Sequence, residues 1–318
     1  MRRQTERMYF LTEKLFVIGA ILFFMGAITP VLRNPEHITG EIQASDSLNV
    51  VLQLMVYGGA MLFLLPYRGR LLNAFAKNPV LCSLLLLILI SCMWSPVPSF
   101  TLRRTIWFML TTSFGLYLGT RFEIKEQIRL VTYALAICVF LSVVFIVALP
   151  RYGIDISMYH GAWRGVFFHK NSLGCYMVVA TMAFLCFRPA TIAEFATKYF
   201  GLVLSAILLI GSMAKGAYVT MLVSILLIFL YRLVRVYWKA LIPAATAAIT
   251  VLGVAAGYVA SNADVFLHAL GKDSSFTGRI PLWRTVLATS AGNRWLGSGF
   301  AGFWAANSHT IWQIMGWK

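Results

Sequence analysis

A group of cationic and hydrogen-bonding residues interrupts the apolar chain at residues 163–174, which read WRGVFFHKNSLG. Arg164, His169, Lys170 and Asn171 fall within eight positions there, just before a long apolar run. Guanidinium and ammonium groups bind phosphate oxygens, an imidazole can move a proton, and an amide can cap a helix or orient a polar ligand. The segment therefore predicts a site for an anionic, hydrogen-bonding ligand. For Asn171 the alternative interpretation is an N-cap of the following helix.

Two further cations, Lys215 and Arg279, lie far from Arg164 in the sequence. The membrane topology given below places all three on one side, where together they could bind a phosphate or a pyrophosphate. The alternative for each is contact with lipid headgroups. The sequence contains no Asp-x-Asp, His-Glu-x-x-His or Cys-x-x-Cys motif. We therefore expect neither a metal ion nor another cofactor at the site.

Aromatic residues near the C-terminal end offer a second kind of contact. Trp283 lies before the glycine-rich segment LGSGFAGFW, and Trp304 is the last residue of that segment. Their flat faces could stack on sugar rings. The alternative is that both belong to the interfacial aromatic belt of a membrane protein.

The rest of the chain must hold these residues, and its composition is that of a membrane protein. Of the 318 residues, 59% are hydrophobic and only 12% are charged, which excludes an ordinary soluble domain. The fold class expected is an all-α polytopic membrane protein. Gly211, Lys215 and Gly216 favour a break inside the stretch 199–231. We predict about nine spans, at 15–32, 48–66, 79–94, 105–120, 130–150, 171–187, 199–214, 216–231 and 240–263.

The distribution of lysine and arginine predicts the orientation. With a cytoplasmic N-terminus, fifteen basic residues fall in cytoplasmic segments and seven in short outer loops, as the positive-inside rule requires. This orientation divides the chain into a cytoplasmic N-terminus (1–14), a transmembrane domain (15–263) and a periplasmic loop (264–318). The net charge of +16 is scattered over short loops, so we expect membrane lipids and no nucleic acid as partners.

The chain resembles the bacterial O-antigen ligase and O-antigen polymerase family, in particular its exopolysaccharide-production branch. Four segments, in the order found in that family, carry the resemblance: CMWSPVPSFTLRRT (92–105), similar to a Trp-Ser-Pro loop before a basic pair; WRGVFFHKNSLG, similar to an Arg-x-x-Gly…Asn-x-x-Gly signature; GSMAKGAYVTML (211–222), similar to a Ser-Arg-Gly-Ala segment; and TGRIPLW…LGSGFAGFW, similar to outer-loop Gly-Arg-x-x-x-Trp and Gly-x-Gly-x-x-x-Trp patterns.

The resemblance implies an inverting, metal-independent glycosyltransferase of the bacterial inner membrane, active on the periplasmic side. Its substrates would be a glycan on an undecaprenyl-diphosphate carrier and a saccharide or lipid A-core acceptor. Arg164, Lys215 and Arg279 would hold the diphosphate. The residues expected to bind or orient the glycan are His169, Lys170, Asn171, Trp283 and Trp304.

Two departures from the family pattern affect the site. Lys215 stands where the family has arginine, which keeps the charge but loses the two-pronged donor. The family's catalytic histidine would follow IWQIMGWK, so the chain is expected to end before it, with His309 as the one candidate base within the sequence. The alternative functions are a non-catalytic transporter or flippase, or a subunit, for lipid-linked glycans.

Overall fold

The computed structural model describes residues 2–27, 47–155, 161–261, 279–290 and 295–307. These residues are almost entirely helical, with one two-stranded antiparallel pairing. In chain order the elements are α1 (Arg2–Phe24), α3 (Ser47–Leu64), η2 (Leu65–Tyr67), α4 (Arg68–Ala76), α5 (Pro79–Ile90), η3 (Ser91–Trp94), α6 (Pro98–Arg121), α7 (Ile124–Ala148), α8 (Pro150–Gly153), β1 (Ile154–Asp155), β2 (Ala162–Trp163), α9 (Lys170–Cys186), α10 (Ile192–Gly211), α11 (Lys215–Ser261), α13 (Arg279–Thr289) and α14 (Gly302–Ala306).

The expected all-α membrane character agrees with the structure. Among the described residues, four helical segments are long and apolar enough to cross a membrane. Two further apolar helices are shorter, Pro79–Trp94 and Lys170–Cys186. The count of nine crossings stays a prediction. The four long segments are Val51–Ala76, Ile124–Ala148, Ile192–Gly211 and Lys215–Leu233.

Between the predicted spans 216–231 and 240–263 the backbone stays helical. A single 47-residue helix, α11, runs through both of them. At 1.5 Å per residue it is about 70 Å long, roughly twice the thickness of a bilayer's hydrocarbon core. The basic segment between the two runs, RLVRVYWK, has no glycine or proline to end a helix, and Pro243 lies inside the helix without ending it. The predicted break between 199–214 and 216–231 is confirmed, because α10 ends at Gly211 and α11 begins at Lys215.

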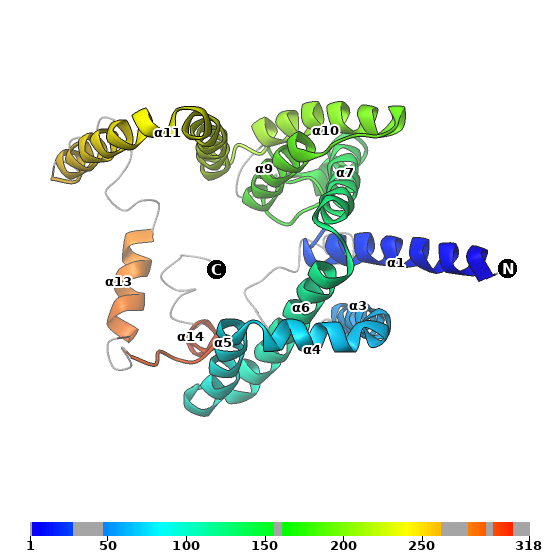
Figure 1. Ribbon diagram of the computed structural model, residues 1–318. Coiled ribbons are helices and arrows are strands. Elements are labelled where there is room, and N and C mark those ends of the chain that lie inside the picture. Colours follow the sequence, from blue (N-terminus) through cyan, green and yellow to red (C-terminus); the bar gives the residue numbers. More distant parts are fainter. Residues whose placement is uncertain (1, 28–46, 156–160, 262–278, 291–294, 308–318) are drawn as a thin grey trace. The chain divides into compact units, whose positions relative to one another are not determined.

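The chain divides into two compact units. The first comprises Met1–Ile90 and Leu102–Met221, and the second comprises Ser91–Thr101 and Leu222–Lys318. In the first unit α7, α9 and α10 lie side by side, with α1 against α7 (Figure 1, green and blue). Their shared core is apolar, and it includes Leu135, Leu173, Phe184 and Leu208.

A glycine and two short hydroxyl side chains allow α9 and α10 to approach closely. Any side chain added at Gly201 of α10 would overlap the ring of Phe184 on α9. Beside this contact, the buried hydroxyls of Thr181 and Ser205 lie 3.0 Å apart and form a hydrogen bond between the two helices. The helices of the first unit are therefore held by specific packing, and the loops at their ends have a fixed framework.

Candidate functional site

Arg164 is held in place by the backbone of the segment that precedes it. Its backbone N–H donates to the carbonyl of Gly153 (2.9 Å). Its Nε donates to the carbonyl of Tyr152 (2.8 Å), and its Nη2 to that of Arg151 (3.1 Å). The guanidinium thus satisfies carbonyls of the short helix α8. A guanidinium has five N–H donors, so further donors remain for an anion.

Two glycines bring the Arg164 loop against α7. Gly165 has a positive φ of 56°, and a Cβ at this position would lie 2.7 Å from Cβ of Ser142. A Cβ on Gly153 would overlap the backbone of Phe145. The loop on both sides of Arg164 therefore packs directly on the C-terminal part of α7, and only glycine fits at these two points.

His169, and not Asn171, is the N-cap of α9, which corrects the alternative interpretation of Asn171. The Nδ1 atom of His169 accepts a hydrogen bond from the backbone N–H of Asn171 (3.1 Å), while the Asn171 side chain is exposed. Because Nδ1 is an acceptor, the neutral imidazole carries its proton on Nε2 and presents a donor. In this arrangement the Nδ1 atom of His169 caps α9.

Burial lowers the pKa of His169 from its ordinary value of 6.5. The neighbouring Asp155 carboxylate acts in the opposite direction, and the positive charge of Lys170 adds to the lowering. Asp155 belongs to β1, where it pairs with Ala162 of β2, and it is 5% exposed. Asp155 was not among the predicted site residues, although it is the single acidic residue between Glu126 and Glu194.

Contacts between small residues bring the starts of α9 and α11 together. A Cβ on Gly174, one turn into α9, would lie 2.8 Å from Cβ of both Ala214 and Ala217. These alanines flank Lys215, the first residue of α11, just as Lys170 is the first residue of α9. The two lysines therefore lie at the same end of the bundle.

Trp163 connects the Arg164 loop to this same end. Its ring packs on Gly211, the last residue of α10, so closely that any side chain there would overlap it. Neither Trp163 nor Gly211 was among the predicted site residues. We call the loops and helix starts at 151–155, 161–174 and 211–217 the cationic end of the bundle. It unites five predicted site residues: Arg164, His169, Lys170, Asn171 and Lys215.

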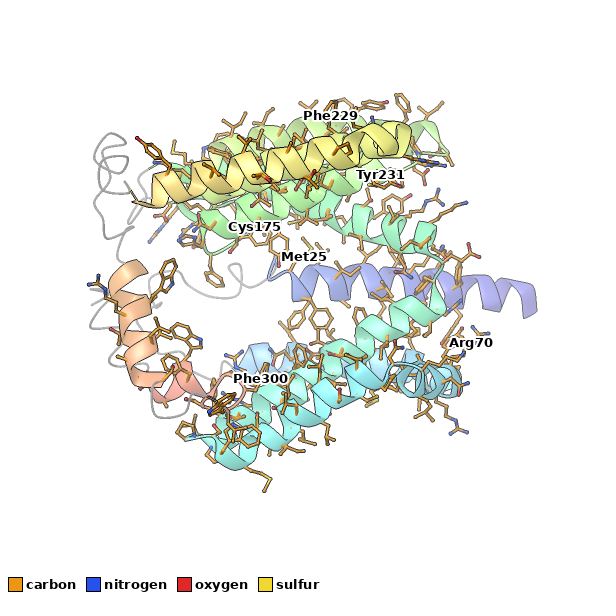
Figure 2. All side chains as sticks on the ribbon, turned by 60° about the vertical axis from the view of Figure 1, so that its left-hand side comes forward. Met25, Arg70, Cys175, Phe229, Tyr231 and Phe300 are labelled. Carbon is orange, nitrogen blue, oxygen red and sulfur yellow. The ribbon has the colours of Figure 1, made fainter. Side chains whose placement is uncertain are left out.

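In the second unit, two of the segments that carry the family resemblance pack against each other. Trp94 donates its indole N–H to the carbonyl of Leu296 (3.0 Å), and Phe300, labelled in Figure 2, donates its backbone N–H to Oγ of Ser91 (3.0 Å). A Cβ on Gly299 would lie 2.8 Å from the carbonyl oxygen of Ser91. The Trp-Ser-Pro loop and the glycine-rich loop thus form one local structure.

The remaining predicted site residues belong to this second unit. Arg279 begins α13, Trp283 on the same helix is 58% exposed, and Trp304 on α14 is 49% exposed. Both indoles are accessible to a ligand. The structure describes each unit by itself, so the predicted meeting of Arg279 with Arg164 and Lys215 stays a prediction. His309 lies outside the described residues.

Comparison with known proteins adds no relative to these observations. No protein-family model matches the chain, and no curated protein sequence or solved structure does so either.

Proposed function

We propose that the chain is part of an integral membrane glycosyltransferase of the O-antigen ligase and polymerase type. It transfers a glycan from an undecaprenyl-diphosphate carrier to a saccharide or to lipid A core. The proposal places it in the bacterial inner membrane with a cytoplasmic N-terminus and a periplasmic site. It rests on the ordered motif segments and on the cations gathered at one end of the first unit.

The observation that carries the proposal is the position of two lysines at helix N-termini. The N-terminus of a helix carries a partial positive charge, so a cation there is unfavourable and an anion is favourable. Lys170 begins α9 and Lys215 begins α11, and Arg164 follows Trp163, whose ring packs on Gly211 at the end of α10. Among the described residues of the cationic end, Asp155 is the single acidic group. Such an arrangement is costly for the bare protein and favourable once a phosphate group binds.

The proposed reaction uses this charge on the leaving group. An acceptor hydroxyl attacks the anomeric carbon of the carrier-linked glycan and loses its proton to a general base. The bond from that carbon to the phosphate oxygen breaks, and the electron pair leaves with the lipid diphosphate. Fixed cations stabilise the negative charge that develops there, without a metal ion. His169 caps the start of α9 through Nδ1, which accepts from the backbone N–H of Asn171, and so orients this part of the site. The base is not assigned to any described residue.

The test is glycan transfer by the full-length protein in membranes, from a carrier-linked donor. Arg164→Ala and Lys215→Gln are expected to abolish or strongly reduce product while the protein still inserts into the membrane. Lys77→Gln is the control, since Lys77 is an exposed cation on the loop after α4. Normal product from the Arg164→Ala and Lys215→Gln variants would overturn the proposal. Movement of the carrier-linked glycan across the membrane with no new glycosidic bond would favour the transporter alternative.

A further inference from the structure

A cavity of about 610 Å³ lies at the opposite end of the first unit's bundle, where α7 begins and α9 ends. We call this end, comprising residues 121–133 and 186–198 with the part of α1 that contacts them, the ion-paired end. Cavities of this volume are the size of small-ligand sites. It is distinct from the cationic end and from the proposed transfer reaction. Its lining residues are Glu123, Lys125, Glu126, Ile128, Arg129, Cys186, Phe187 and Arg188.

Two of the charged groups in this lining are already neutralised. Glu126 forms an ion pair with Lys14 of α1 (2.5 Å). Arg129 forms one with Glu194 of α10 (3.4 Å). The Glu194 carboxylate also accepts from the hydroxyl of Tyr133 and from the backbone N–H of Ala190. These pairs hold helices together and leave little capacity for a ligand.

Three charged groups of the lining remain available. Lys125, Arg188 and Glu123 are exposed and form no ion pair or side-chain hydrogen bond with the described residues. The C-terminal carbonyls of α9, which would repel an anion, already accept from Lys198, whose Nζ lies 2.7 Å from the carbonyl oxygen of Phe187. The cavity thus offers two cations and one carboxylate. This set matches a zwitterion better than a simple anion.

Apolar surface continues from the cavity along the helices. Ile124 is 67% exposed and Leu185 is 49% exposed, both next to a lining residue in sequence, and Ile192, four residues after Arg188, is 91% exposed. In a membrane these side chains face lipid acyl chains. A ligand with a polar headgroup and acyl chains fits both features: the headgroup binds the charged groups of the cavity, and the acyl chains lie along the apolar surface.

We propose that the cavity binds the headgroup of a membrane phospholipid that carries a phosphate and an ammonium group, of the phosphoethanolamine type. The phosphate lies between Lys125 and Arg188, and the ammonium donates to the Glu123 carboxylate. Basic pockets between membrane helices are known to take lipid headgroups. The carboxylate sets the preference for a headgroup with N–H donors over a quaternary amine or a neutral alcohol.

The test is lipid retention by the full chain, purified in mild detergent and supplied with one lipid at a time, with adducts counted by native mass spectrometry. Phosphatidylethanolamine is expected to be retained several-fold more than phosphatidylcholine or phosphatidylglycerol. The double variant Lys125→Gln, Arg188→Gln is expected to lose about tenfold in retention. Glu123→Gln is expected to bind phosphatidylethanolamine and phosphatidylcholine equally, and Lys77→Gln to behave as the unchanged protein.

Three results would overturn the proposal. One is equal retention of the three lipids by the unchanged protein. This measurement does not depend on the folding of any variant. Another is unchanged retention by the double variant. The third is displacement of the lipid by millimolar soluble phosphoethanolamine or inorganic phosphate, which would identify a soluble phosphate compound as the ligand. None of these results depends on glycan transfer, so the two proposals fail separately.

Discussion

The two ends of the α7–α9–α10 bundle differ in whether the cations that contact the helices have carboxylate partners. At the ion-paired end, Arg121, Lys14 and Arg129 each have a carboxylate partner, on Glu13, Glu126 and Glu194 respectively. At the cationic end, Arg164 bonds to backbone carbonyls, and Lys215 has no partner among the described residues. A paired charge stabilises the fold, whereas a cation without a carboxylate is available to a ligand. At the ion-paired end Lys125 and Arg188 are likewise unpaired within the described part of the chain, so the contrast is between the paired charges that join the helices and the unpaired cations that a ligand can reach.

The largest effect is expected from breaking the buried pair at the ion-paired end. Glu13 is fully buried and accepts from Arg121 through both oxygens, at 3.0 and 2.8 Å, and from the hydroxyl of Tyr117 (2.5 Å). Glu13→Ala leaves Arg121 and Tyr117 without this partner, and the expected cost is about 3 kcal/mol of unfolding free energy. The measurement is unfolding by sodium dodecyl sulfate in mixed micelles.

Glu126→Gln supplies the matched control at the same end. The Lys14–Glu126 pair is partly exposed, with side-chain exposures of 27% and 30%, so its loss is expected to cost only about 0.5 kcal/mol. Equal losses in the two variants would mean that burial does not distinguish these pairs.

The next largest effect is expected at the cationic end, from packing and not from charge. Gly211→Ala places a methyl group into the ring of Trp163, so the Trp163–Arg164 segment must move. The expected cost is about 2 kcal/mol, together with faster proteolysis of the segment 161–169. Gly216→Ala, in the first turn of α11, meets nothing within 4 Å and is expected to be neutral or slightly stabilising. If both variants behave alike, Trp163 does not fix the loop.

Composition and apolar periodicity predict the helical class and the break at Gly211, because these depend on local sequence. Long-range contacts are not visible in this way. Nothing in the segment MRRQTERMYFLTEK shows that Glu13 is fully buried against Arg121, more than a hundred residues later. The packing of Trp163 on Gly211 is likewise a property of the fold and not of either segment.

Two local details of the backbone differ from the sequence-based interpretation, for identifiable reasons. Asparagine is a stronger N-cap than histidine in general, which favoured Asn171, but the extended backbone at His169 (φ −134°, ψ 141°) makes that residue the cap. The basic segment at 232–239 suggested a membrane boundary and hence a turn. A change in polarity does not end a helix, and this segment contains no residue that does.

A smaller effect is expected from protonation of His169. Its folded-state pKa is lowered, so below about pH 6.5 the unfolded chain binds more protons than the folded chain, and stability falls as the pH falls. Protonated Nδ1 also cannot accept from Asn171, which removes the cap at a cost of about 1 kcal/mol. His169→Asn retains an acceptor without titrating. The unfolding free energy of the unchanged protein, minus that of His169→Asn, is expected to fall between pH 7.5 and pH 5. A constant difference would contradict this role, given that Asp155 and Lys170 remain in both proteins.

The smallest effect on stability is expected from Lys215, and its smallness is what tests the contrast between the two ends. Lys215 is exposed, lacks a carboxylate partner among the described residues, and begins α11, where its charge opposes the helix dipole. Lys215→Gln is therefore expected to stabilise the protein by about 0.3 kcal/mol while reducing glycan transfer. Gain of stability with loss of transfer is the pattern of a residue kept for a ligand. A loss of stability approaching that of Glu13→Ala would show that Lys215 supports the fold, and the cationic end would then be a second structural network.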